Sequence, residues 1–349
     1  MTPLEALNRV VYLMDRSLAE PNKVNAFRNA AAVVAELPEG EIEARAAAGT
    51  VTDLAGIGKS TAAVITEALA GEVPTRIVDL EASSVVPLGT KGTPYREALK
   101  GDCHSHSFWS DGSASIEQMA TTAMELGHDY LVLTDHSPRL TVAHGLNAER
   151  LREQLSEIAF LNERIAPFRV LTGIEVDILE DGSLDQDVEL LERLDVVVAS
   201  AHSKLRMDRP AMTRRLVLAV ASPHVDILGH CTGRKLRSTV SQVASDPEVV
   251  RPESQFDPEI VFAACARFDT AVEINCRPER QDPPDHLLEL ALEWECKVSI
   301  DTDAHAPGQL EWQNFGCDKA AKHEIAIDSI VNTWPAERLL EWAGSHPTG

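Results

Sequence analysis

Short apolar runs alternate with helical patterns over the larger, C-terminal part of the chain. Apolar strands that alternate with helices indicate a parallel sheet buried on both faces. Seven such repeats predict a closed barrel, one short of the usual eight. We therefore expect an α/β fold built on a distorted (β/α)7 barrel. The predicted strands are 101–105, 129–134, 168–174, 195–200, 225–229, 271–275 and 297–301, and the predicted helices are 115–127, 147–165, 185–193, 211–221, 257–267, 285–295 and a stretch near the C-terminus.

The first 85 residues have helical spacing and lack the alternation of strands. Apolar positions between Leu4 and Met14 follow a helical period, and further helices are predicted at 24–37, at 41–48 and after residue 58. Residues 86–99 have the Pro and Gly composition of a linker. The sequence thus predicts an all-α domain at 1–85, a linker at 86–99 and the barrel domain at 100–349.

A glycine-containing turn lies between two of the N-terminal helices, at residues 54–62. Gly56 and Gly58 allow a tight turn with backbone N–H groups facing outward, and a turn at a helix N-terminus can hold a phosphate oxygen. With Lys59 beside it, this is the pattern of a helix-hairpin-helix that binds the DNA backbone. Residues 1–85 carry seven Lys and Arg against twelve Asp and Glu, so a docking or oligomerisation domain is the alternative.

Composition and charge narrow the range of partners. The formal net charge is −23, which argues against a broad nucleic-acid surface, because phosphate contacts need Lys and Arg. The chain begins without a basic-then-apolar leader and has no apolar run near 18 residues, so we expect a cytoplasmic protein without a membrane partner. Six dispersed cysteines without a Cys-x-x-Cys pair indicate reduced thiols.

The candidate chemistry falls at the predicted strand ends. His104 and His106 stand at i and i+2 on a strand and point to the same side, and Asp303 and His305 repeat this spacing. A single histidine at a strand end is more often structural, but here one predicted strand after another ends in a histidine. Nine imidazole and carboxylate groups exceed one tetrahedral zinc and suit two or three divalent ions of Zn, Mn or Fe. The nine are His104, His106, Asp111, His136, Glu175, His202, His230, Asp303 and His305.

Such a set of ions would generate hydroxide at neutral pH and stabilise phosphoryl transfer, which points to a phosphoesterase. The motifs of this sequence resemble those of the PHP (polymerase and histidinol phosphatase) superfamily. The segments 173–182, 228–234 and 272–275 are similar to the PHP domain of bacterial family X DNA polymerases, and residues 1–100 resemble their helix-hairpin-helix domain. A polymerase palm has no room in the linker.

The resemblance implies roles for individual residues. One ion would be held by His104, His106, Glu175 and Asp303, a second by Glu175, His202 and His230, and a third by Asp111, His136 and His305. Catalysis would then rest on Glu175, Asp303 and His202, with Arg234. Arg234 could grip a substrate phosphate through two N–H groups, although a surface salt bridge is the alternative. Lys204, Arg214 and Arg280 are further candidates for substrate binding, alongside Gly56, Gly58 and Lys59 for DNA.

Some family X domains carry a lyase lysine after the hairpin, and Val64 stands at the matching position. We therefore do not expect lyase activity. The expected function is a phosphoesterase acting on DNA 3′ ends, as a 3′–5′ exonuclease, a 3′-phosphatase or an enzyme acting at abasic sites. The alternatives are a small-molecule phosphatase, for example one acting on histidinol phosphate, and a non-catalytic scaffold. The hairpin favours DNA, and the acidic surface favours a small phosphate ester.

Overall fold

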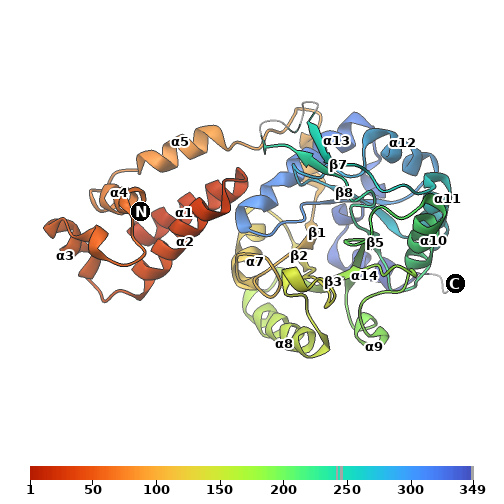
Figure 1. Ribbon diagram of the computed structural model, residues 1–349, viewed down its shortest axis with the longest axis horizontal. Coiled ribbons are helices and arrows are strands. Elements are labelled where there is room, and N and C mark those ends of the chain that lie inside the picture. The colour runs from red at the N-terminus through yellow and green to blue at the C-terminus, as the bar shows by residue number, and fades with distance from the viewer. Residues whose placement is uncertain (241–242, 244–246, 347–349) are drawn as a thin grey trace. The chain divides into compact units, whose positions relative to one another are not determined.

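The computed structural model describes residues 1–240, 243 and 247–346. These residues form two compact units, one of Met1–Val86 and one that begins at Pro87. Figure 1 shows the helices and strands of both units.

The first unit is entirely helical. Thr2 caps the first helix, because its hydroxyl accepts the Glu5 N–H while the Glu5 carboxylate accepts the Thr2 N–H. Leu7, Val10 and Leu13 are fully buried where this helix packs against the others. The helices are α1 (Pro3–Arg16), α2 (Pro21–Glu36), α3 (Glu41–Ala48), α4 (Lys59–Leu69) and α5 (Thr75–Ser83), with a 3-10 turn η1 (Val51–Asp53).

The turn before α4 is a helix-hairpin-helix turn, but its two glycines have different roles. Gly56 has φ +88°, a left-handed conformation that side chains rarely adopt. Gly58 has φ −96°, and its N–H donates to the Thr61 hydroxyl over 3.0 Å. The expectation of an outward-facing N–H is therefore wrong for Gly58, because Thr61 takes it. The first turn of α4 still leaves the N–H groups that follow without helical partners.

The second unit contains a parallel sheet of seven strands in the order β1-β2-β3-β4-β5-β8-β9. The first and last strands meet, because Ser105 forms a bridge with Ala304 and the His106 N–H donates to the Ala304 carbonyl over 2.8 Å. This nearly closed barrel confirms the predicted α/β fold, and every strand lies at its predicted place. The strands are β1 (Gly101–Ser105), β2 (Tyr130–Leu133), β3 (Arg169–Asp177), β4 (Val196–Ser200), β5 (Ile227–Leu228), β8 (Ala271–Asn275) and β9 (Val298–Asp301).

Helices surround the sheet, as Figure 1 shows. The strands are buried almost throughout, which explains their continuous apolar sequence. All six cysteines are buried free thiols, as expected. The helices are α6 (Thr93–Ala98), α7 (Ile116–Glu125), α8 (Ala148–Ile165), α9 (Val188–Leu191), α10 (Arg209–Val220), α11 (Pro258–Phe268), α12 (Asp285–Glu293), α13 (Gln313–Lys322) and α14 (Ala336–Ala343), with 3-10 turns η2 (Thr141–Ala143), η4 (Pro307–Trp312), η5 (Ile327–Ser329) and η6 (Val331–Thr333).

Two features differ from the predicted organisation. The expected linker at 86–99 contains α6, and the Gly89 N–H donates to Asp318 over 2.9 Å, so most of this segment packs on the barrel unit. A hairpin of β6 (Lys235–Arg237) and β7 (Glu248–Arg251) was not predicted. Its strands have three and four residues, too few for an apolar run to mark them. Within the described ranges, none of the helices has the length and apolar character needed to span a bilayer.

A buried histidine should make the barrel unit sensitive to acid. His128 is 5% exposed, and burial together with nearby Arg96 lowers its pKa to about 3. The pKa of His128 in the folded state lies below its value in the unfolded state. The stability that the neutral His128 contributes is therefore present above about pH 6.5 and is lost as the pH falls towards 3. We expect His128→Leu to remove the loss, which amounts to about 1.4 kcal/mol per pH unit below about pH 6.

Urea unfolding of both proteins between pH 4.5 and 7.5 measures this difference. The exposed His286 provides the control, since His286→Leu should leave the pH dependence as it is. Parallel curves for wild type and His128→Leu would contradict the prediction.

Candidate metal centre

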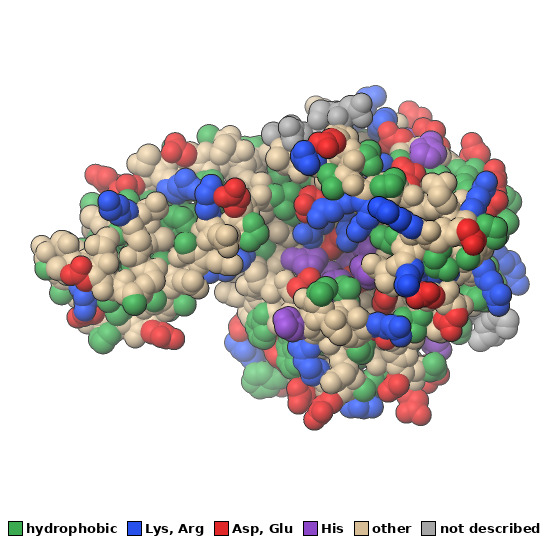
Figure 2. Space-filling model, viewed as in Figure 1, with side chains coloured by type: hydrophobic (Ala, Val, Ile, Leu, Met, Phe, Trp, Pro, Cys, Tyr) green, Lys and Arg blue, Asp and Glu red, His purple; other side chains and the backbone are tan. Residues whose placement is uncertain are grey.

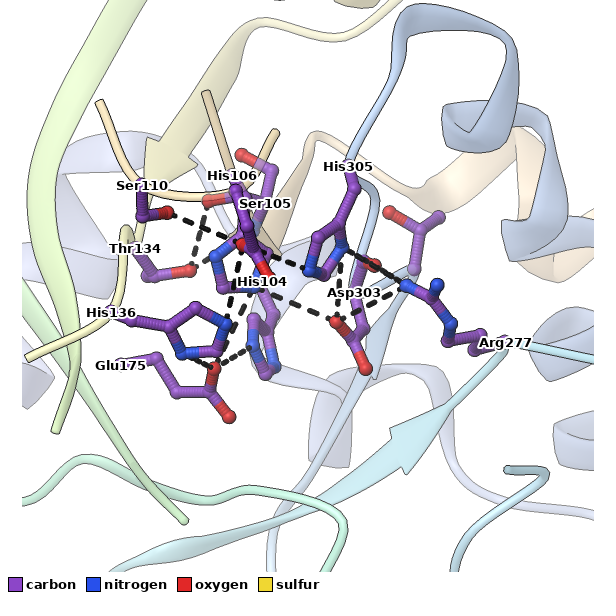
Figure 3. Close-up of polar contacts among 12 residues, drawn as sticks. His104, Ser105, His106, Ser110, Thr134, His136, Glu175, Arg277, Asp303 and His305 are labelled. Atoms are coloured by element: carbon purple, nitrogen blue, oxygen red, sulfur yellow. Dashed lines mark hydrogen bonds and ion pairs between the residues drawn. The ribbon is translucent and has the colours of Figure 1, made fainter. Parts of the chain in front are cut away.

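Five imidazole rings surround the carboxylate of Glu175, which is 1% exposed on β3. Figure 3 shows Glu175 with three of them, those of His104, His106 and His136. Its Oε2 lies 2.8 Å from His136 Nδ1, 3.4 Å from His104 Nε2 and 3.6 Å from His106 Nε2. Its Oε1 lies 2.9 Å from His230 Nε2 and 3.2 Å from His202 Nε2. A carboxylate with both oxygens faced by histidines is placed to bridge two ions.

The two remaining carboxylates lie on the other side of His106. Asp303 Oδ1 is 3.5 Å from both His106 Nε2 and His305 Nδ1. Asp111 Oδ1 is 3.3 Å from His305 Nε2 and 3.4 Å from His136 Nε2. The structure therefore brings all nine predicted groups together. Three sets of these residues have possible ligand atoms that lie within 4.8 Å of one another in the structure. They are His106, Asp111, His136 and His305; His104, His106 and Glu175; and His136, Glu175 and His202.

The donor atoms fit divalent metal ions. Both ring nitrogens of His106 and of His202 are buried without a hydrogen-bond partner, as are single ring nitrogens of His104 and His230. Leaving such groups unpaired costs free energy, which a bound cation would offset. Burial lowers the pKa of His106 well below its ordinary value, and the neighbouring His305 and His136 lower it further. A neutral imidazole is the form that binds metal.

Acidic residues that the sequence reasoning missed orient these histidines. Glu273 on β8 is fully buried, and its Oε1 lies 2.6 Å from His104 Nδ1 while its Oε2 accepts the backbone N–H of His230 over 2.5 Å. Asp177 accepts the backbone N–H of His202 over 3.0 Å, and its Oδ1 lies 3.3 Å from His202 Nδ1. A carboxylate inside the apolar strand 271–275 was the available signal for Glu273. A partner on the second ring nitrogen fixes the tautomer and orientation of a metal-binding histidine.

We predict that Glu273→Gln lowers metal affinity or hydrolytic activity by about 10- to 100-fold, as is typical when the partner of a ligating histidine is replaced. The amide keeps the shape of the side chain but removes the charge that favours a proton on His104 Nδ1. Metal titration of the variant and of wild type gives the two affinities. The exposed Glu293 on α12 serves as the control in the form Glu293→Gln, and equal affinities for all three proteins would contradict the prediction.

The cluster opens into a cavity of about 260 Å³ bordered by cations. Figure 2 shows histidine side chains in a hollow with Lys and Arg side chains along its edge. The Arg280 Nε–H donates to Asp303 Oδ2 over 3.0 Å, and Arg277 Nη1 donates to the Asp303 carbonyl over 3.0 Å. The lining residues are Asp111, His136, Leu140, His202, Lys235, Arg251, Arg277, Glu279, Arg280, Asp303 and His305.

The predicted substrate-binding residues fall in different places. Arg280 lines the cavity, as does Arg277, which was not predicted. Arg234 does not line it, because its guanidinium donates to the carbonyls of Arg280 and Gln281 and so holds the loop that carries Arg280. Arg214 is exposed on α10 outside the cavity, and Lys204 lines a neighbouring cavity. Gly56, Gly58 and Lys59 belong to the helical unit.

Comparison with known proteins now adds to this geometry. The model of the PHP domain family matches residues 102–236, and that of a helix-hairpin-helix domain family matches residues 2–73. The DNA polymerase/3′-5′ exonuclease PolX of Bacillus subtilis (strain 168) is 37% identical over 234 residues, which cover 67% of this chain and 39% of PolX. A protein called "Probable phosphatase" in Thermoanaerobacter sp. (strain X514) is 27% identical over 243 residues, covering 66% of this chain and 89% of that protein.

Among solved structures, the histidinol phosphate phosphatase (HISK) of Lactococcus lactis subsp. lactis Il1403, complexed with Zn, L-histidinol and phosphate, is 18% identical. It has a TM-score of 0.43 and covers 64% of this chain and 92% of that one.

The match to the PHP domain and the similarity to a protein named as a probable phosphatase support a hydrolase of the class that acts on phosphate ester bonds. The chain carries a PHP domain, preceded by a helix-hairpin-helix domain. It spans about two fifths of the length of the Bacillus relative, at 39%.

Proposed function

We propose that this protein is a metal-dependent phosphoesterase that acts on the 3′ ends of DNA, as an exonuclease, a 3′-phosphatase or an enzyme acting at abasic sites. One observation carries the proposal. In a chain of net charge −23, four cations line the cavity over the metal-ligand cluster: Lys235, Arg251, Arg277 and Arg280. Such a gathering of positive charge suits an anionic substrate, because it raises the local concentration of phosphate esters.

Each part of the site would have a distinct task. The sets predicted for three ions are His104, His106, Glu175 and Asp303; Glu175, His202 and His230; and Asp111, His136 and His305. When bound there, the ions would supply hydroxide at neutral pH and Lewis-acid stabilisation of phosphoryl transfer. Arg280 and Arg277 would bind and orient the phosphate oxygens, and their pairing with Asp303 holds both guanidinium groups at the cluster.

The helical unit supports DNA as the substrate. Its hairpin turn presents Gly56 and the start of α4, a geometry suited to a phosphate oxygen. The chain is similar over 234 residues to a protein named DNA polymerase/3′-5′ exonuclease. The second candidate is a small-molecule phosphatase, which the net charge of −23 and the similarity to a protein named as a phosphatase favour.

Parallel assays on a DNA duplex with a labelled 3′ end and on histidinol phosphate separate the candidates. We expect the metal-loaded full chain to process the DNA end, His104→Ala to lose this activity, and Lys59→Glu to weaken DNA binding. The exposed Lys23 supplies the charge-matched control Lys23→Glu for the hairpin variant. Turnover of histidinol phosphate without turnover of DNA would overturn the DNA assignment.

A further inference from the structure

A second cavity of about 540 Å³ adjoins the one over the metal-ligand cluster. His202 and Arg251 line both cavities, so the two lie next to each other at these side chains. One wall of the second cavity is the loop after β4, at 202–207, and the other is the segment after β7, at 251–255. A molecule with its phosphate at the cluster therefore has its substituent directed to this space or to solvent.

The loop 202–207 is held from beneath by a buried arginine. Arg215 is 1% exposed, and its guanidinium donates to the Ser203 carbonyl over 2.8 Å and to the Ile178 carbonyl over 3.0 Å. On the other wall, the Arg251 Nε–H donates to the Gly233 carbonyl over 2.7 Å. These bonds anchor both walls to the barrel unit, so the cavity does not depend on a ligand to form.

The lining combines apolar side chains with cations. Leu205, Met207 and Pro252 supply apolar surface, and Lys204 and Arg206 add positive charge beside Arg251. Arg206 has no ion pair with any residue that the structure describes, and Lys204 reaches Glu180 only at 4.0 Å. Glu253 is the acidic residue of the lining, and it lies 3.8 Å from Arg234. Three cations against one carboxylate stand out in a chain of net charge −23.

Apolar surface beside guanidinium groups suits a nucleobase, since each base offers a flat face over which an Arg cation can lie and a neighbouring phosphate with which it can pair. Ligand cavities of about 300–1,000 Å³ hold molecules of nucleoside size or larger, whereas a phosphate with a short polar substituent would leave most of this space empty. The size, apolar lining and charge together favour a nucleoside over a small alcohol.

We propose that this second cavity is a subsite for the terminal nucleoside of a DNA strand whose phosphate lies at the metal-ligand cluster. The inference rests on the proposed function and makes it more specific, because it names the part of the substrate that the loop 202–207 and Arg251 recognise.

Binding of phosphonates tests the subsite without catalysis, because their P–C bonds resist hydrolysis. Calorimetry on the metal-loaded full chain would compare thymidine 3′-methylenephosphonate with methylphosphonate. We expect the nucleoside compound to bind at least about tenfold more tightly, and Leu205→Glu to abolish the difference by placing a carboxylate on the apolar wall. Leu205→Ala, a milder change, should reduce it about threefold. The control Val188→Glu also replaces an apolar residue by glutamate, at an exposed position on α9. It should leave the difference between the two phosphonate affinities as in wild type.

Equal affinities of the two phosphonates for wild type, or an undiminished difference in both Leu205 variants, would overturn the subsite. The proposed function fails separately, if the wild type does not process a DNA 3′ end. Processing of DNA ends together with equal phosphonate affinities would leave the function standing and remove the subsite.

Discussion

Replacement of Glu175 by glutamine should reduce phosphate ester hydrolysis by at least about 10³-fold, since in the proposed site Glu175 would hold more than one ion and metal ions contribute several kcal/mol each to transition-state stabilisation. Five histidines face this carboxylate, the nearest at 2.8 Å. Burial opposes ionisation of Glu175, yet His202, His104 and His136 together lower its pKa well below the ordinary value. The side chain is therefore charged, and the amide would lack the charge that joins two ions.

Steady-state kinetics and the metal content of the purified protein test this prediction together. Glu175→Gln should bind fewer ions per chain as well as losing activity, which distinguishes a ligand from a residue that only shapes the substrate pocket. Glu189→Gln, on the exposed surface of α9, is the matched control and should keep both properties. A fully active Glu175→Gln protein would rule out the bridging role.

Removal of metal with a chelator should lower the melting temperature of the barrel unit by about 8–16 °C. A ligand present at about a thousand times its dissociation constant stabilises the folded state by about 4 kcal/mol. In a domain of this size, each kcal/mol corresponds to about 2–4 °C. The physical reason is that the ring nitrogens of His106 and His202 are buried without a hydrogen bond, and ions bound at the cluster would supply their partners.

Calorimetric scans before and after chelation, followed by re-addition of zinc or manganese, measure the shift. The shift should shrink as the pH falls below about 6, because protons compete with metal for neutral imidazole. In Glu175→Gln the chelator should have a smaller effect, which provides the control for chelator binding elsewhere. An unchanged melting temperature in wild type would mean that the cluster contributes no metal-linked stability.

The barrel and the ligand cluster could be predicted because their signals are local in the sequence. Strands such as Val196–Ser200 are buried throughout and read as uninterrupted apolar runs. The spacing of His104 and His106 places both side chains on one face of β1, whatever the surrounding fold. The parallel arrangement of the strands then brings their ends to one edge of the barrel.

The features that were missed depend on contacts between distant segments. Arg234 was expected to face substrate, but its long side chain turns to the carbonyls of Arg280 and Gln281, a direction that no local pattern encodes. No role was predicted for Glu273, because its carboxylate contacts His104 and His230, which are distant from it in the sequence. The hairpin of β6 and β7 places Lys235 and Arg251 over the cavity although each strand has at most four residues, too few for a periodic signal.

The meeting of β1 with β9 has a consequence for the order in which the site can form during synthesis. His104 and His106 leave the ribosome nearly two hundred residues before Asp303 and His305, yet Ser105 pairs with Ala304 in the folded protein. A nascent chain therefore exposes seven of the nine predicted ligand groups before Asp303 and His305 exist. Translation that stops short of the last strand would yield a product without the full cluster, so incomplete chains should lack the hydrolytic activity of the finished protein.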